Sequence, residues 1–222
     1  MKKILAVSLM FATTLSAAEP MEPSLETISK RVVEIHMRTV EKPVVQEARK
    51  RKIQQMPLMR SGLCSGAFID AFGNIITARH CVEGFDQFEV VTYDQRVYKA
   101  QVLAVSPIHD LALIHIDRLN TPFFDPSNDI QVGTPVSILG SPLGITGTLS
   151  QGVVAKLHGD ITLVDCSVLP GNSGGPVFDR RGKLVGVATA GFVVMMGMTH
   201  LNLIQSIDAV YFFVVGALGR NR

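Results

Sequence analysis

The sequence is short of several residue types, and each shortage excludes a class of protein. It has no tryptophan and three tyrosines among 222 residues, against 19 glycines, a balance that favours an all-β fold with many turns. Three cysteines are too few for a disulfide scaffold but enough for one bridge. The sequence has 21 basic and 19 acidic residues, so its net charge is small. A small net charge does not favour binding to nucleic acid or to acidic membranes. With 47% hydrophobic and 18% charged residues, the chain is not disordered and suits one compact unit.

No apolar run reaches the roughly 20 residues that span a bilayer. The first run, 4–15, follows the basic start of the chain and precedes small residues at 16–18. This order predicts a signal peptide over residues 1–18, and the alternative is an uncleaved anchor. The second run, 209–218, predicts a packed terminal helix. We therefore expect an exported protein, periplasmic or secreted, without stable membrane insertion after cleavage.

Residues 19–60 differ from the rest and are expected to form an N-terminal extension. Ser24, followed by Glu26, predicts the start of a short helix, and residues 32–37 are typical of a strand. The stretch 41–60 is rich in lysine and arginine and is predicted to be a long exposed loop. Its basic run is either a solvated face or a docking surface.

From Gly62 onward, short apolar segments alternate with turn signals, which indicates a β-sandwich or barrels. Hairpin turns are expected at 70–74 and 179–183, where glycine can take a positive φ. The Pro-, Asn- and Asp-rich stretch 120–129 is typical of a linker between two β halves. The predicted strands are 67–69, 74–77, 88–92, 102–105, 111–116, 136–139, 151–155, 161–164, 176–178 and 184–188.

The most informative stretch is Gly-Asn-Ser-Gly-Gly-Pro at residues 171–176. A serine between glycines lies on a tight turn that keeps its hydroxyl exposed. The amides that flank it can converge on one point, as an oxyanion hole requires. An ordinary β-turn uses the same residues, so this motif alone leaves both interpretations open.

Two further segments favour catalysis over a plain turn. His80 follows an apolar strand, and Asp110 precedes another. Either residue alone is more often structural. The order His80, Asp110, Ser173 is, however, that of the chymotrypsin-type triad.

Together these segments resemble a chymotrypsin-fold serine protease, and specifically the protease domain of the HtrA/Deg group, from about Gly62 to Val210. The matching stretches are 64–70, 73–77, 110–113, 139–144, 170–176 and 201–206, with His80 and Asp165. The resemblance implies an all-β fold of two six-stranded antiparallel barrels and a short C-terminal helix. The protease domain would cover 61–222, with barrel one to about 120 and barrel two from about 130.

The resemblance also implies a role for each motif residue in the cleft between the barrels. Ser173 would be the nucleophile and His80 its general base, while Asp110 would orient the imidazole and stabilise its cation. The amides of Gly171 and Ser173 would hold the oxyanion, with Asn172 shaping the turn.

The sequence departs from the pattern of related proteases in three places. Digestive-type relatives carry an aspartate where Asn172 stands, so activation by an ion pair with a newly cut N-terminus is not expected. HtrA relatives usually continue into a PDZ domain, whereas this sequence stops at Arg222, so regulation through such a module is not expected. Their trimers use N-terminal segments, and 19–60 is too divergent to carry this over, which leaves a homo-oligomer open.

The resemblance pairs Cys64 with Cys81 in a disulfide and leaves Cys166 as a buried thiol. It also predicts an S1 pocket, the pocket for the residue before the cleaved bond (P1). Relatives that cut after lysine or arginine carry an acid at the position of Ser167, and the nearest acid here is Asp165. We therefore expect cleavage after Val, Ala, Leu or Ile. The pocket would be lined by Ser167, Val168, Leu169, Thr189, Ala190 and Gly191.

The sequence thus predicts an exported serine endopeptidase that cleaves unfolded or exposed polypeptide segments through an acyl-enzyme. No metal is expected, since the remaining histidines show no ligand spacing. No cofactor and no nucleic-acid partner are expected either. His109, beside Asp110, is assigned a structural role. The alternatives are a catalytically weak binding or chaperone-like module with this fold, and an esterase.

Overall fold

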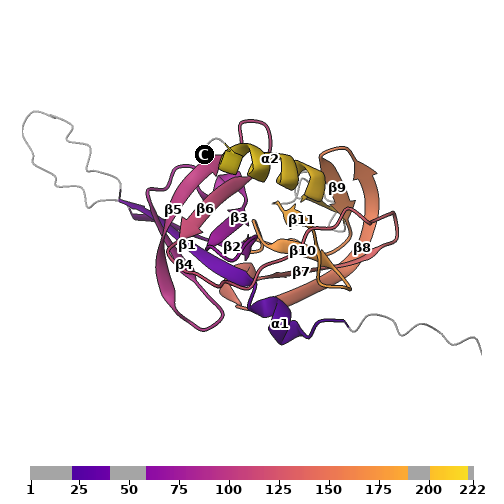
Figure 1. Cartoon of the computed structure of the whole chain (residues 1–222), viewed down its shortest axis with the longest axis horizontal. Coiled ribbons are helices and arrows are strands. Elements are labelled where there is room, and N and C mark those ends of the chain that lie inside the picture. Colours follow the sequence, from indigo (N-terminus) through magenta and orange to yellow (C-terminus); the bar gives the residue numbers. More distant parts are fainter. Residues whose placement is uncertain (1–21, 41–58, 190–200, 220–222) are drawn as a thin grey trace, which may run out of the picture.

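The computed structural model describes residues 22–40, 59–189 and 201–219 (Figure 1). The predicted signal peptide, most of the basic loop, and Ala190 and Gly191 of the expected S1 pocket lie outside the described residues. Within the described ranges, no helix has both the length and the apolar character to cross a membrane.

Six of the described strands close the first barrel in the order β1-β2-β3-β6-β5-β4, each pair antiparallel. β1 pairs with both β2 and β4, and its alternate residues Val33, Ile35 and Met37 are buried. The first barrel therefore begins within the segment set apart above as an extension. The strands are β1 Val32–Val40, β2 Met59–Phe68, β3 Asn74–Thr77, β4 Gln87–Val91, β5 Val97–Val105 and β6 Ala112–Ile116.

Six later strands close the second barrel in the order β10-β11-β12-β9-β8-β7, again antiparallel. The expected fold class, two six-stranded barrels with a short C-terminal helix, is confirmed. The strands are β7 Pro135–Gly140, β8 Thr148–His158, β9 Ile161–Val164, β10 Pro176–Asp179, β11 Leu184–Ala188 and β12 Asn202–Ser206.

Within the described ranges, two α-helices flank the barrels. α1, Leu25–Ser29, begins where Ser24 predicts, because the Ser24 hydroxyl accepts a hydrogen bond from the Thr27 amide at 3.2 Å. α2, Ile207–Gly219, packs on β11 and β12 and is the yellow helix of Figure 1.

The two expected glycine turns form as predicted. Gly73 has φ +88° and Gly182 has φ +71°, in the left-handed region that glycine tolerates. In the first turn, Asp70 Oδ1 accepts the amides of Phe72 (2.9 Å) and Asn74 (3.2 Å), so the side chain fixes the hairpin between β2 and β3.

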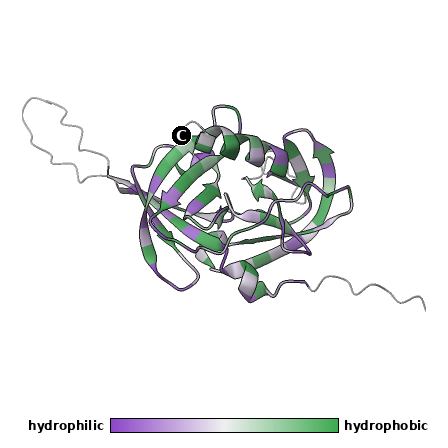
Figure 2. Ribbon diagram, in the orientation of Figure 1, coloured by the Kyte–Doolittle hydropathy of each residue, from purple (hydrophilic) through white to green (hydrophobic). Residues whose placement is uncertain are grey.

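Three buried clusters hold the molecule together, one inside each barrel and one between them. Hydrophobic and hydrophilic residues alternate along several strands, as a half-buried barrel wall requires (Figure 2). The third cluster joins Leu139 and Phe178 of the second barrel to Ala67 and Ile76 of the first, with Phe124 from the connecting segment. This cluster fixes how the barrels sit against each other.

Candidate active site

The three residues of the expected triad lie on short turns at the ends of strands. His80 belongs to the 3-10 turn η1, Arg79–Cys81, which follows β3. Asp110 lies in the turn between β5 and β6, and Ser173 in the glycine turn before β10. The first two therefore come from barrel one and the third from barrel two.

His80 and Asp110 form a direct pair. Asp110 Oδ2 lies 2.7 Å from His80 Nδ1, and Oδ1 accepts the His80 backbone amide at 3.0 Å. Burial raises the pKa of Asp110, but the hydrogen bonds and charge of His80 outweigh it and hold that pKa below its ordinary value. An ionised carboxylate can only accept, so the neutral imidazole carries its proton on Nδ1 and leaves Nε2 free as a base.

Ser173 is held against the first barrel through its backbone. Its carbonyl accepts the Ser65 amide of β2 at 2.8 Å and lies 3.7 Å from Cys81 Sγ, next to His80. Gly174 must be glycine here, because an added Cβ would lie 2.1 Å from Thr77 Oγ1 and its φ is +81°. Ser173 and His80 thus share one neighbourhood, although their side chains make no hydrogen bond to each other in the described structure.

The glycine turn also presents two amides without an acceptor. Among the described residues, no oxygen accepts the backbone N–H of Gly171 or of Ser173, and both residues are buried. Buried amides are normally paired, so two free ones side by side need an explanation. This is the arrangement that an oxyanion hole requires, because the donors of such a hole stay unpaired until charge develops on the substrate.

Hydrogen bonds to the carbonyls keep these amides in place. Leu143 N donates to Pro170 O at 2.8 Å, and Gly175 N donates to Asn172 O at 2.9 Å. In a trans peptide the N–H points opposite to the carbonyl, so these bonds direct the Gly171 and Ser173 amides to the other side.

The middle peptide of the turn is held by Ser65. Its hydroxyl donates to Gly171 O at 2.7 Å and accepts the Ser141 amide at 3.2 Å. Sequence analysis assigned no role to Ser65, Ser141 or Leu143. Ser65 lies among the apolar residues at the end of β2, and this position was the available signal for its side chain, which is fully buried.

Asn172 carries no charge and has no ion-pair partner. Its side chain is buried, and Oδ1 has no hydrogen-bond donor among the described residues. An aspartate at this position would bury an unpaired charge, which costs far more than an unpaired amide oxygen. The asparagine is therefore consistent with a loop whose conformation does not depend on an ion pair with a charged N-terminus.

The disulfide expected between Cys64 and Cys81 is present, with the two Cα atoms 6.1 Å apart. It ties β2 to the turn that carries His80. The three ligand atoms of Cys64, His80 and Cys81 lie within 4.8 Å of one another, but disulfide sulfurs offer no thiolate to a metal. Cys166 is free and buried, as expected.

Four of the six expected S1 residues are described. Leu169 and Ser167 are exposed, Val168 packs on the core of the second barrel, and buried Thr189 donates to Leu203 O at 3.0 Å. Asp165 is turned away to β8, where its carboxylate accepts the Val153 amide at 2.5 Å. None of these four residues offers a charge to a basic side chain.

His109 makes a contact that links the two barrels. Its Nε2 lies 3.1 Å from Asp160 Oδ2, in the turn between β8 and β9. This pair ties the turn that carries Asp110 to the second barrel. The structural role expected for His109 thus has a specific partner, which strand alternation alone could not identify.

Comparisons with known proteins agree on one family. A family model described as "Trypsin-like peptidase domain" matches residues 64–187. A "Probable periplasmic serine endoprotease DegP-like" of Chlamydia trachomatis is 33% identical over 149 residues, 62% of this chain and 30% of the relative. Its counterpart in Halomonas elongata is 31% identical over 159 residues, 67% of this chain and 34% of the relative. The chain thus spans about a third of the length of these relatives.

Solved structures show the same fold. "HtrA-type protease AlgW with decapeptide" superposes with a TM-score of 0.70 at 25% identity, over 87% of this chain and 67% of that one. A serine endoprotease from Yersinia pestis has a TM-score of 0.71 over 91% of this chain and 70% of its own, at 20% identity, which supports the fold alone.

Proposed function

The chain belongs to the family of trypsin-like peptidase domains, and from that premise we propose that it is a serine endopeptidase with the triad His80, Asp110 and Ser173. The observation that carries the proposal is the conjunction of the His80–Asp110 pair with two free, buried amides beside Ser173. Acyl transfer needs both a general base and an oxyanion hole. Either feature alone would be equally consistent with an ordinary, non-catalytic turn.

The residues perform the reaction in two halves. Ser173 Oγ attacks the carbonyl carbon while His80 Nε2 takes its proton, and the amides of Gly171 and Ser173 stabilise the oxyanion. The tetrahedral intermediate collapses, His80 returns the proton to the leaving amine, and an acyl-enzyme remains. Water then attacks the ester with His80 again as base, which frees the acid product and Ser173. Asp110 stays ionised and stabilises the imidazolium in both halves.

The substrates are exposed segments of unfolded proteins, cleaved after Val, Ala, Leu or Ile. The relation to a protease solved with a decapeptide supports polypeptide substrates. The absence of a charge on the described S1 residues, with Asp165 bound to β8, supports an apolar P1 residue. A burial gain of roughly 0.8 kcal/mol per methylene then orders the preferred residues by size and fit.

The site of action is outside the cytoplasm. The curated relatives are named periplasmic, and a disulfide beside His80 suits an oxidising compartment. The signal peptide over residues 1–18 is the route of export.

Labelling with a fluorophosphonate tests the chemistry directly. The folded protein should acquire one label, and Ser173→Ala should acquire none. Ser61→Ala is the matched control, because Ser61 is an exposed serine of β2, and it should label normally. Cleavage of casein, with products sequenced by mass spectrometry, should then show apolar P1 residues.

Two outcomes would refute this proposal. Well-folded protein that takes no label would be a binding module rather than an enzyme. Hydrolysis of a short ester without any cleavage of casein would make it an esterase.

A further inference from the structure

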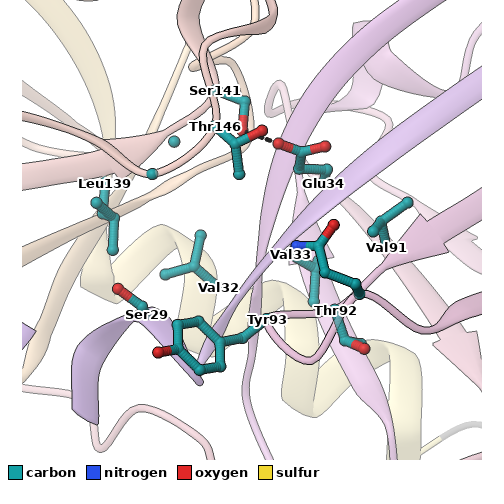
Figure 3. A pocket seen from close by; sticks show the side chains of 13 residues that line it. Ser29, Val32, Val33, Glu34, Val91, Thr92, Tyr93, Leu139, Ser141 and Thr146 are labelled. Carbon is teal, nitrogen blue, oxygen red and sulfur yellow. Dashed lines mark hydrogen bonds between the residues drawn. The ribbon is translucent and has the colours of Figure 1, made fainter. Parts of the chain in front are cut away.

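A cavity of about 180 Å³ lies between the two barrels (Figure 3). Its walls come from the end of α1, the start of β1, the turn between β4 and β5, and the end of β7 with the loop that follows. Val32, Val91 and Leu139 contribute apolar surface to the lining. A cavity of this size takes one long side chain rather than a drug-sized molecule.

Glu34 is the only carboxylate among the residues that line this cavity. Its Oε1 accepts the Ser141 hydroxyl at 2.5 Å, and Oε2 lies 3.4 Å from His36 Nε2. Burial raises the pKa of Glu34, but hydrogen bonds from Ser141, Thr146 and His36 outweigh it and hold that pKa below its ordinary value. The cavity therefore presents a carboxylate that is ionised at neutral pH.

No lysine or arginine of the described chain pairs with this carboxylate. Its partners are two hydroxyls and an imidazole, so its charge is hydrogen-bonded but not balanced by a permanent cation. The Glu34 side chain is 17% exposed, and a carboxylate largely withdrawn from water favours a cationic partner. A partly apolar cavity with such a carboxylate in its wall is complementary to a side chain with an alkyl stem and a cationic tip.

We propose that this cavity is a second polypeptide-binding site, which takes a lysine or arginine side chain with Glu34 as its counter-ion. The proposal rests on the proposed function only in that its ligand is a polypeptide. It separates two kinds of recognition, since the S1 residues suit an apolar side chain and this cavity suits a basic one. The preferred substrate would carry a basic residue outside the cleaved bond.

The cavity adjoins the oxyanion loop. Gly140 lines the cavity, and an added Cβ at Gly140 would lie 2.6 Å from Asn172 Oδ1. Ser141, which donates to Glu34, also donates its amide to Ser65, whose hydroxyl holds Gly171. A polypeptide anchored here is therefore held next to the catalytic turn, which raises the effective concentration of its other segments at the cleft.

Binding is best measured on Ser173→Ala, because this variant has no nucleophile and does not consume the probe. The probe is an acetylated, amidated pentapeptide, Gly-Ala-Lys-Ala-Gly, titrated against amide signals of the labelled full chain by NMR. The comparison peptide replaces lysine with norleucine, which keeps the stem and removes the charge. We expect the lysine peptide to shift the signals of Glu34, Thr92 and Gly140, and to bind about tenfold more tightly than the norleucine peptide.

A second variant tests whether Glu34 supplies the negative charge that binds the lysine peptide. Adding Glu34→Gln should weaken binding of the lysine peptide about tenfold and leave the norleucine peptide unchanged. Glu89→Gln is the matched control, since Glu89 lies on the neighbouring strand β4 and pairs with Arg38 on the surface. Its affinity for both peptides should equal that of the parent.

Equal affinity for the two peptides, or shifts confined to residues 167–173, would overturn the proposal. The shift map is recorded on the parent, so it decides the question even where Glu34→Gln fails to fold. A negative result in the peptide titration does not affect the labelling of Ser173 by a fluorophosphonate. A negative labelling result likewise does not affect the peptide titration, so the two proposals are tested separately.

Discussion

Ser65 holds the turn that carries the proposed oxyanion hole, although it touches no reacting atom of the proposed mechanism. Its hydroxyl bonds to the Gly171 carbonyl and fixes the peptide between the two free amides. Removing it should let that peptide rotate, and small displacements of catalytic groups are costly in rate. Ser65 is in this sense a positioning residue of the proposed site.

Ser65→Ala should therefore lower kcat by about tenfold to a hundredfold and leave KM nearly unchanged. Steady-state kinetics on a peptide with valine at P1 separate the two constants. Ser61→Ala, on the exposed part of the same strand, should change neither. A loss that fell only on KM would contradict the positioning role.

Cys166 offers a second test at the scale of one residue. Burial, followed by the charge of Asp165, raises the pKa of its thiol from 9.0 to about 11. A raised pKa means that the folded state keeps the proton, so the stabilisation is present below pH 9 and is lost as pH rises through about 11.

At pH 8 a thiol reagent should find no reactive cysteine in the native, unreduced protein. It should find one after denaturation and three after reduction, because Cys64 and Cys81 are bonded to each other. Two or three thiols without reduction would contradict the disulfide.

At the scale of elements, the strands made of consecutive or alternating buried apolar residues could be predicted closely. Residues 74–77, 136–139 and 161–164 fall on β3, β7 and β9 because their apolar side chains mark the buried face. β5 is longer than the predicted 102–105, since Lys99 and Gln101 face solvent and hide the start of the strand. A continuous apolar run marks residues 102–105, whereas Lys99 and Gln101 interrupt the apolar residues at the start of β5, so that part was missed.

The proposed site could be located from the sequence where a motif marks it, and not where packing forms it. Ser173, His80 and Asp110 stand in recognisable local contexts, and their catalytic roles stay a prediction. Ser65 and Ser141 act through neighbours 76 or more residues away, and only the docking of the two barrels brings these together. No local pattern encodes such a contact.

The turn that carries Asp110 is tied to the second barrel by His109 and Asp160. Because Asp160 is largely exposed, the pair should contribute only about 0.5 kcal/mol to stability. A double-mutant cycle with His109→Gln and Asp160→Asn measures that coupling by urea unfolding. Additive effects of the two substitutions would show that the tether contributes nothing.

For the whole molecule, the buried cluster between the barrels is the contact that holds the two barrels together. Phe124 is buried there, with its ring centroid 5.9 Å from that of Phe178. Phe124→Ala should lower the free energy of unfolding by about 3–5 kcal/mol, through lost burial and the cavity left behind. Its neighbour Phe123 is 40% exposed, so Phe123→Ala should cost far less in the same denaturant titration.

Lowering the pH should reduce the free energy of unfolding of the whole molecule. The folded pKa values of Asp110 and Glu34 lie below the ordinary 3.8 and 4.5. Their stabilisation is therefore complete above the unfolded values and is lost as pH falls through the folded ones. Between pH 5 and pH 3, the unfolding free energy of Glu34→Gln should fall less steeply than that of the parent, whereas Glu89→Gln is the surface control.

The division of the proposed triad between the two barrels also determines when the chemistry can first arise during folding. His80 and Asp110 come from strands that are made early, but the second barrel closes only when β12 pairs with β9 and β11. The contact between barrels further needs Ile207, Ala209 and Val210 of α2. A chain that has folded only as far as Ser173 thus has a base and a nucleophile but lacks the strands and the helix that hold them together. Cleavage therefore requires almost every described strand to have folded into place.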